Sequence, residues 1–173
     1  MANYIPISTV TVGSGGVASI DFTGIPQTYT DLQIVISART AFADVMNDLI
    51  LQFNGDTGAN YSTKRLEGNG SGVASDTASS GALYGAFIPM SAANATANTF
   101  GNGSAYISNY TSANQKLFST DSVAETNATA TKMSLCAAIW TGTAPISSIK
   151  VRSYHGSNLV QYSTATLYGI RKY

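Results

Sequence analysis

Apolar and polar residues alternate along most of this chain, which is the pattern of strands that bury one face and expose the other. The clearest case is the segment 31–39, where Leu32, Ile34 and Ile36 fall on one face and mostly polar residues on the other. No long window follows the period of 3.6 residues that an amphipathic helix requires. The one competing interpretation is a single helical turn over residues 41–48. The pattern therefore predicts an all-β protein.

Glycine, asparagine, aspartate or proline interrupts this alternation at regular intervals and divides the chain into about ten strands. The predicted strands cover residues 5–12, 17–22, 31–39, 48–53, 61–66, 83–90, 105–110, 116–124, 132–140, 146–153 and 159–170.

Three local features refine this prediction. The glycine-rich residues 13–16 should join the first two strands as a hairpin. The stretch 68–81 contains almost only small and polar residues, which predicts a mobile or partner-facing loop. In the strand 146–153, Ile149 and Val151 should face inward while the two basic residues between and after them face outward.

Short strands at even spacing, without helices between them, are typical of sandwiches and barrels. We therefore expect an antiparallel β-sandwich or β-barrel. Because no shift in composition divides the chain, residues 1–173 should form a single domain.

Charged residues make up only 10% of the 173 residues, and nine basic residues balance nine acidic ones. A neutral chain has no long-range attraction for nucleic acid or for an anionic membrane surface, so neither is an expected partner. Exposed sheet edges are commonly protected by lysines, which are scarce here. Edges that are closed or covered by a partner are therefore expected, which favours an oligomer or docking onto something larger.

Few residues are suited to catalysis or metal binding. A single cysteine, Cys136, excludes disulfides within the chain, and a single histidine, His155, excludes sites built from several histidines. Cys136 lies in an apolar run and should be a small buried side chain. His155 lies between two strands, and no Gly-x-Ser-x-Gly motif surrounds any serine, so we interpret it as an exposed loop residue.

The carboxylates include two pairs with a spacing of four residues, Asp44 with Asp48 and Asp121 with Glu125. A glycosidase needs two carboxylates across a cleft, but their small polar neighbours favour solvated surface positions. The segment 54–58 combines oxygen-bearing side chains with glycines, yet it lacks the ligands of an EF-hand. It is predicted to be a turn, and a calcium site of another kind that uses Asp56 stays open.

Ten tyrosines remain as candidate contact residues. Tyr106 with Tyr110, and Tyr162 with Tyr168, have even spacings and should share a sheet face. Packing between strands is the favoured role, and stacking on sugar rings is the alternative. The chain also starts without the charged and apolar regions of a secretory signal, and no apolar run is long enough to span a membrane as a helix.

Several segments together resemble a family of small virion structural proteins from tailed bacteriophages. The resemblance extends from about residue 4 to residue 170 and rests on the segments 25–32, 51–62, 109–112, 118–121 and 164–170. The last three residues, 171–173, extend beyond the Gly-Ile pair at which members of the family end.

The resemblance implies an antiparallel, jelly-roll-like β-sandwich that is displayed on the virus particle, and no catalytic residues come with it. We expect assembly in the host cytoplasm, and neither a cofactor nor a metal. Our first hypothesis is a capsid decoration (cement) protein that binds the major capsid protein, and itself as a homotrimer, and stabilises the shell. Residues 1–7 and 68–81 are the candidate shell contacts. The alternative is a tail, fibre or adhesin component that binds host glycans through exposed tyrosines. The pool for such a site is Tyr84, Tyr106, Tyr110, Tyr154 and Tyr162.

A third hypothesis is a depolymerase that acts through Asp121 and Glu125. We favour a non-enzymatic protein, because no other feature of the sequence supports catalysis.

Overall fold

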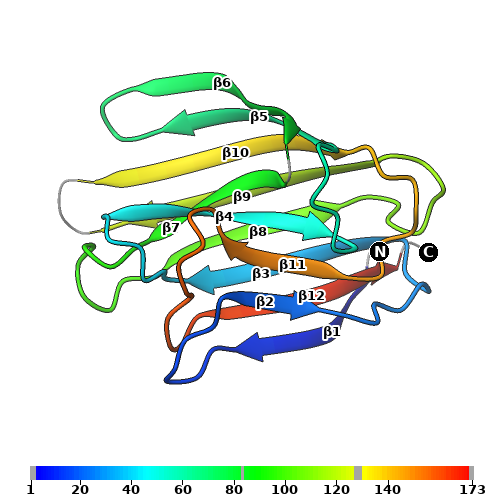
Figure 1. The fold of residues 1–173 in the computed structure, drawn as a ribbon, viewed down its shortest axis with the longest axis horizontal. Coiled ribbons are helices and arrows are strands. Elements are labelled where there is room, and N and C mark those ends of the chain that lie inside the picture. The colour runs from blue at the N-terminus through cyan, green and yellow to red at the C-terminus, as the bar shows by residue number, and fades with distance from the viewer. Residues whose placement is uncertain (1–2, 83, 127–129, 172–173) are drawn as a thin grey trace.

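The computed structural model describes residues 3–82, 84–126 and 130–171, and these residues form twelve strands in two sheets (Figure 1). The larger sheet contains, in spatial order, β1 (Asn3–Thr11), β12 (Thr164–Arg171), β3 (Asp31–Ala38), β8 (Gly101–Ile107), β9 (Lys116–Glu125), β10 (Thr131–Trp140), β5 (Tyr61–Gly68) and β6 (Val73–Ala82). The smaller sheet contains β2 (Ser19–Phe22), β11 (Ile149–Ser153), β4 (Met46–Phe53) and β7 (Gly85–Ser91).

All ladders between these strands are antiparallel, which confirms the predicted all-β, antiparallel sandwich. The described ranges contain no helix that is long and apolar enough to cross a membrane. The helical turn considered for residues 41–48 does not form, because this segment bends and then enters β4 at Met46.

The alternation seen in the sequence places the core between the two sheets. In β3, Leu32, Ile34 and Ile36 are at most 1% exposed, and in β11 Ile149 and Val151 are equally buried, as predicted. One connected cluster of buried side chains draws on strands of both sheets.

Aromatic side chains form the centre of this core beneath β9, β10 and β5. The ring of Phe53 on β4 meets Phe118 edge-on at 5.0 Å between centroids and Trp140 at 5.7 Å. The Tyr61 ring centroid lies 6.1 Å from that of Phe53. The Tyr61 hydroxyl donates to the backbone oxygen of Asp56 and accepts a hydrogen bond from the backbone N–H of Phe53. Such edge-to-face contacts add about 0.5–1.5 kcal/mol each beyond area burial.

Two sequence-based expectations about connectivity are wrong. The first two strands do not form a hairpin, since β1 pairs with β12 in the larger sheet and β2 pairs with β11 in the smaller one. Residues 73–82 form strand β6 instead of a loop. Its backbone pairs with β5, and such a ladder needs no apolar side chains.

The two sheets differ in width, and this difference positions the surface described below. Strand β7, at one edge of the smaller sheet, packs over β8, β9 and β10 and reaches only the margin of β5. The β5–β6 hairpin therefore projects past the smaller sheet, as Figure 1 shows at the top of the view.

Candidate functional site

The outer face of the larger sheet, which points away from the smaller sheet, has two chemically different halves. Over β1, β12, β3 and β8 it carries mainly hydroxyl groups, and Thr9 and Thr166 contact each other through their hydroxyls at 3.0 Å. Over β9, β10, β5 and β6 the same face carries large aliphatic side chains, together with Lys64, Asp121 and Glu125. We define the outer apolar patch as Leu66, Val73, Leu117, Met133 and Leu135, whose exposed fractions lie between 49% and 78%.

Strand register joins four members of the outer apolar patch, while Leu117 lies further along the face, opposite Ile139 on β10. Leu135 on β10 lies opposite Leu66 on β5. Met133 lies opposite Gly68, which in turn lies opposite Val73 on β6. Because residues two apart on a strand share a face, Met133 and Leu135 are also neighbours along β10.

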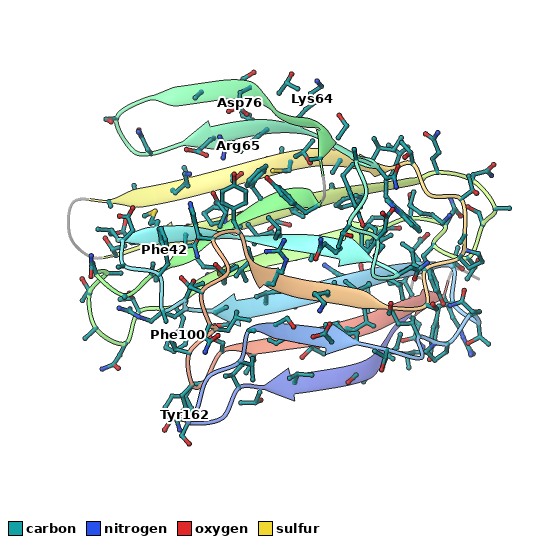
Figure 2. The ribbon with its side chains drawn as sticks, viewed as in Figure 1. Phe42, Lys64, Arg65, Asp76, Phe100 and Tyr162 are labelled. Atoms are coloured by element: carbon teal, nitrogen blue, oxygen red, sulfur yellow. The ribbon has the colours of Figure 1, made fainter. Side chains whose placement is uncertain are left out.

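A shallow groove of about 680 Å³ runs along this half of the face. Its walls include Leu66, Leu135 and Ala137, with hydroxyls of β6 and β9 between them. Lys64 lies at its rim and donates its ammonium to the Thr77 hydroxyl at 2.8 Å. Figure 2 shows Lys64 beside Asp76 at the β5–β6 end of the molecule. The groove thus combines apolar walls with three charged residues in its lining, Lys64, Arg65 and Asp76.

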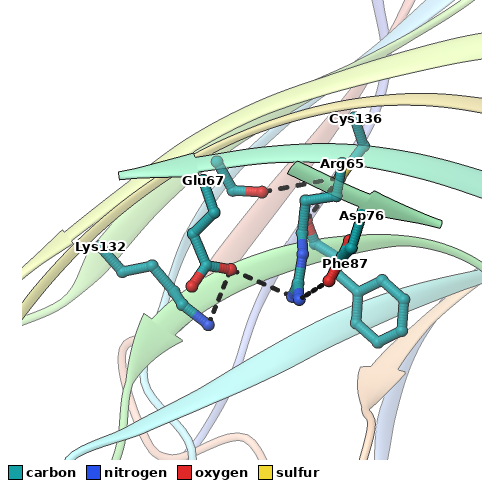
Figure 3. Close-up of polar contacts among 7 residues, drawn as sticks. Arg65, Glu67, Asp76, Phe87, Lys132 and Cys136 are labelled. Atoms are coloured by element: carbon teal, nitrogen blue, oxygen red, sulfur yellow. Dashed lines mark hydrogen bonds and ion pairs between the residues drawn. The ribbon is translucent and has the colours of Figure 1, made fainter. Parts of the chain in front are cut away.

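The inner side of the β5–β6 hairpin holds a cluster of ion pairs (Figure 3). The guanidinium of Arg65 lies 3.1 Å from Glu67 and 2.9 Å from Asp76, and the Lys132 ammonium lies 3.0 Å from the same Glu67 oxygen. Burial opposes the charged form, but the Asp76 hydrogen bond and the nearby carboxylates outweigh it, so the pKa of Arg65 is raised. The guanidinium also stacks over Phe87 at 5.4 Å. These contacts fasten the projecting hairpin to β7 and β10.

Asp48 lies near this cluster, and burial raises its pKa although Lys132 and Arg65 lower it. Its partner in the sequence pair, Asp44, accepts the backbone N–H of Val45 at 2.6 Å in the bend before β4. Asp44 therefore lies in a bend, whereas Asp48 lies in strand β4.

The second pair, Asp121 and Glu125, lies on the outer face of β9. Four residues of extended strand separate their Cα atoms by about 13 Å. Paired glycosidase carboxylates lie roughly 5–9.5 Å apart. The Asp121 carboxylate also accepts the Ser104 hydroxyl at 2.5 Å. This arrangement does not present two facing carboxylates to one substrate.

Asn54 and Gly55 form the predicted turn, with φ angles of 52° and 68°. The Asp56 carboxylate that follows accepts N–H groups from Trp140 at 2.6 Å, Gly58 at 2.8 Å and Asn60 at 2.9 Å. Desolvation opposes the charged form, but these donors outweigh it and lower the pKa of Asp56. Because N–H donors surround it, this carboxylate is a poor cation ligand. Among the described residues, no group of three or more His, Cys, Asp or Glu side chains could hold a metal ion.

His155 is exposed, as predicted, and it stacks on Phe42 at 4.1 Å with nearly parallel rings. Its Nδ1 lies 2.9 Å from the side-chain oxygen of Asn47, not in a contact with a serine. The Tyr154 ring meets the His155 ring edge-on at 4.7 Å between centroids. The Tyr84 ring in turn lies 5.4 Å from the Tyr154 ring. Together these rings form an aromatic row at the edge of the smaller sheet. Cys136 is 1% exposed and packs under this row against Phe87 and Ile50, which confirms its predicted burial.

The even spacing of tyrosines was misleading. Tyr106 lies on the outer face of β8 and donates its hydroxyl to Asp31 at 2.5 Å, whereas Tyr110 lies beyond the strand and is fully buried. Tyr168 belongs to β12, but Tyr162 lies in the preceding turn and is 68% exposed. A positive φ, at Asn109 and at Tyr162 itself, breaks the strand geometry in each pair.

Of the candidate shell contacts, residues 3–7 form the start of edge strand β1, and residues 68–81 form the turn of the β5–β6 hairpin and most of β6. Residues 1–2 and 172–173 lie outside the described residues. Arg171 places its guanidinium 5.3 Å above the ring of Tyr29 in its own chain.

Lys116 begins β9 with its side chain buried in the core. Its ammonium donates to the backbone oxygens of Asn114 and Thr143 and lies 5.8 Å from the Trp140 ring. Burial lowers the pKa of Lys116. Nothing places this ammonium within reach of a ligand, so its role is structural.

The outer apolar patch was missed by sequence reasoning, although the signal was present. In the run 133–140, Met133, Leu135 and Ile139 alternate with Ser134 and Cys136, so both faces of β10 carry apolar residues. Only one face of β10 can pack into the core, so the apolar residues on its other face stay exposed. No family model matches the chain, and neither a curated protein nor a solved structure matches it.

Proposed function

We propose that this chain is a virion structural protein of a tailed bacteriophage, and that it acts as a capsid decoration protein which binds the major capsid protein through the outer apolar patch. The main observation behind this proposal is that five large aliphatic side chains are exposed on one half of the outer face of the larger sheet. Soluble monomers rarely expose contiguous apolar surface of this kind without an interaction to cover it. The family resemblance over residues 4–170 supports a capsid subunit as the occupant.

The chemistry of the patch suits a static contact. Burying apolar surface contributes roughly 25 cal/mol per Å², and a stable interface covers about 1,200–2,000 Å² in total. The neutral composition provides little electrostatic steering, so association would depend on contact area and repetition. The hydroxyl-rich half of the same face carries few charges that would repel closely packed copies.

We further propose that copies associate as a homotrimer and assemble on the particle in the host cytoplasm. Three linked docking surfaces would strengthen weak individual contacts through a high effective concentration. Sedimentation of the purified protein at micromolar concentration tests this part, since a stable monomer would contradict the trimer.

A role without catalysis is part of the proposal. Two observations support this part: Asp121 and Glu125 lie far apart along β9, and the His155 Nδ1 lies within hydrogen-bond distance of the Asn47 side-chain oxygen.

The decisive experiment is cryo-electron microscopy of particles assembled with variant proteins. Replacing Leu66 and Leu135 together with serine should remove about 2–4 kcal/mol of docking energy and reduce occupancy of the capsid at least 30-fold at limiting concentration. The matched control is Val35→Ser, which changes an aliphatic residue that is 46% exposed on the hydroxyl-rich half. Density on the tail, or full capsid occupancy by the double variant, would overturn the proposal.

A further inference from the structure

The turn before β12 holds an exposed aromatic side chain on a strained backbone. The backbone N–H of Ser163 bonds to the oxygen of Val160 at 3.1 Å, and Tyr162, the third residue of this turn, has a φ of 70°. That position of a type II turn favours glycine, and a bulky residue there is an outlier. Tyr162 is nevertheless 68% exposed, so packing in the core does not account for it.

Hydrogen bonds hold this turn rigidly on the ends of other strands. The Tyr162 N–H donates to the oxygen of Val12 at 3.0 Å, and the Val160 N–H donates to the oxygen of Arg39 at 2.9 Å. The Ser163 hydroxyl bonds to both the N–H and the oxygen of Arg39. The Tyr162 ring is therefore carried by a fixed backbone rather than by a free loop.

A surface hollow of about 330 Å³ adjoins this ring. It is lined by Arg39, Ala97, Asn98, Phe100, Val160, Gln161 and Tyr162. Figure 2 shows Tyr162 and Phe100 at one end of the sandwich, far from Lys64 and Asp76 beside the outer apolar patch. A second hollow of about 280 Å³ shares Val160 and Gln161 with the first and continues toward Asn158 and Ser14.

Within the described part of the chain, the hollow around Tyr162 offers a ligand no charged group that is free to bind it. Arg39 is the charged member of the lining among the described residues, and its guanidinium is already committed to backbone oxygens. One terminal nitrogen donates to Thr96 at 2.8 Å and Thr99 at 3.0 Å, and the other donates to Ala95 at 2.9 Å and Ala93 at 3.1 Å. The side chains left to meet a ligand are two aromatic rings and two amides.

We infer that these hollows form a binding site for a neutral saccharide, with the Tyr162 ring as its stacking platform. A pyranose ring presents an apolar C–H face that packs on an aromatic face, while its hydroxyls need groups that both donate and accept. Amides such as Asn98 and Gln161 provide both functions, and the volume of the hollow is at the lower end of those that hold small ligands. A backbone strained at an exposed position is a recognised feature of ligand sites. The two adjoining hollows suit more than one sugar unit.

The site is independent of capsid docking. It lies at the opposite edge of the sandwich from the outer apolar patch, so a copy docked through that patch leaves it open. The experiment accordingly uses the purified protein without particles.

Saturation-transfer NMR with the methyl glycosides of glucose, galactose, mannose and N-acetylglucosamine tests the inference, with glucuronic acid as the acidic comparison. At least one neutral glycoside should show transfer to its ring C–H protons. Tyr162→Gly, which suits the backbone, and Asn98→Gly, at another positive φ of 63°, should each weaken binding at least tenfold. Tyr4→Ala, at a tyrosine that is 52% exposed on β1, should leave binding unchanged. Transfer to no neutral glycoside, transfer to the acidic sugar alone, or unchanged binding by Tyr162→Gly would overturn the inference.

Discussion

Two variants, Tyr162→Gly and Tyr162→Ala, allow the backbone strain at position 162 to be measured as a difference in stability. Both remove the exposed ring, and only glycine relieves the positive φ of 70°. A left-handed residue other than glycine costs about 1–2 kcal/mol, while glycine loses roughly 0.5–1 kcal/mol more conformational entropy on folding than alanine. The difference predicts that the glycine variant is more stable than the alanine variant by about 0.5–1 kcal/mol.

Urea unfolding monitored by the fluorescence of Trp140 is a suitable assay, because this single tryptophan is 4% exposed in the aromatic core. The midpoint should be higher for Tyr162→Gly than for Tyr162→Ala, with equal slopes. In a thermal scan the expected gap is about 1–4 °C for a domain of this size. A glycine variant that is equal to or less stable than the alanine variant would refute the reasoning, since it would mean that the turn relaxes without cost.

Three further changes probe the fold. Phe53→Ala should cost about 3–5 kcal/mol of unfolding free energy because it empties the centre of the aromatic core, and a denaturation midpoint close to the wild type would contradict the packing described. Gly169→Ala should cost about 1–3 kcal/mol, since a Cβ there would lie 2.3 Å from the Tyr29 ring; an unchanged melting temperature would show that the ring moves freely. Asp48→Asn should raise the melting temperature at pH 7 and give no gain at pH 3. The raised pKa of Asp48 means that the folded state disfavours its ionised form, so wild-type stability falls as pH rises from about 3.8 through the folded pKa. An equal gain at both pH values would contradict this assignment.

The sequence predicted individual strands well and their partners poorly. Alternation in β3 and β11 depends only on which residues meet the core, and that information is local. The partner of β1 is more than 150 residues away along the chain, as the contact between Thr9 and Thr166 shows, and no local pattern encodes it. Strand β6 escaped detection because its pairing with β5 uses backbone groups, while its own side chains are small and polar.

The surface features were less predictable than the core. The outer apolar patch depends on which face of β10 is left uncovered, and that follows from the unequal widths of the two sheets. Tyr162 was assigned to a strand by its even spacing from Tyr168, and its turn depends on bonds to Val12 and Arg39, which are distant in sequence. Cys136, His155 and the Asn54–Gly55 turn were predictable, because burial, exposure and turn preference are properties of short segments.

The pairing of β1 with β12 places Asn3 opposite Arg171, with the two strands side by side at one edge of the larger sheet (Figure 1). β1 pairs with β12, so its ladder cannot form during synthesis until residues 164–171 have been made. A polypeptide that ended before β12 would leave both β1 and the facing side of β3 without their pairing partner, and unpaired strand edges of this kind favour association with other chains.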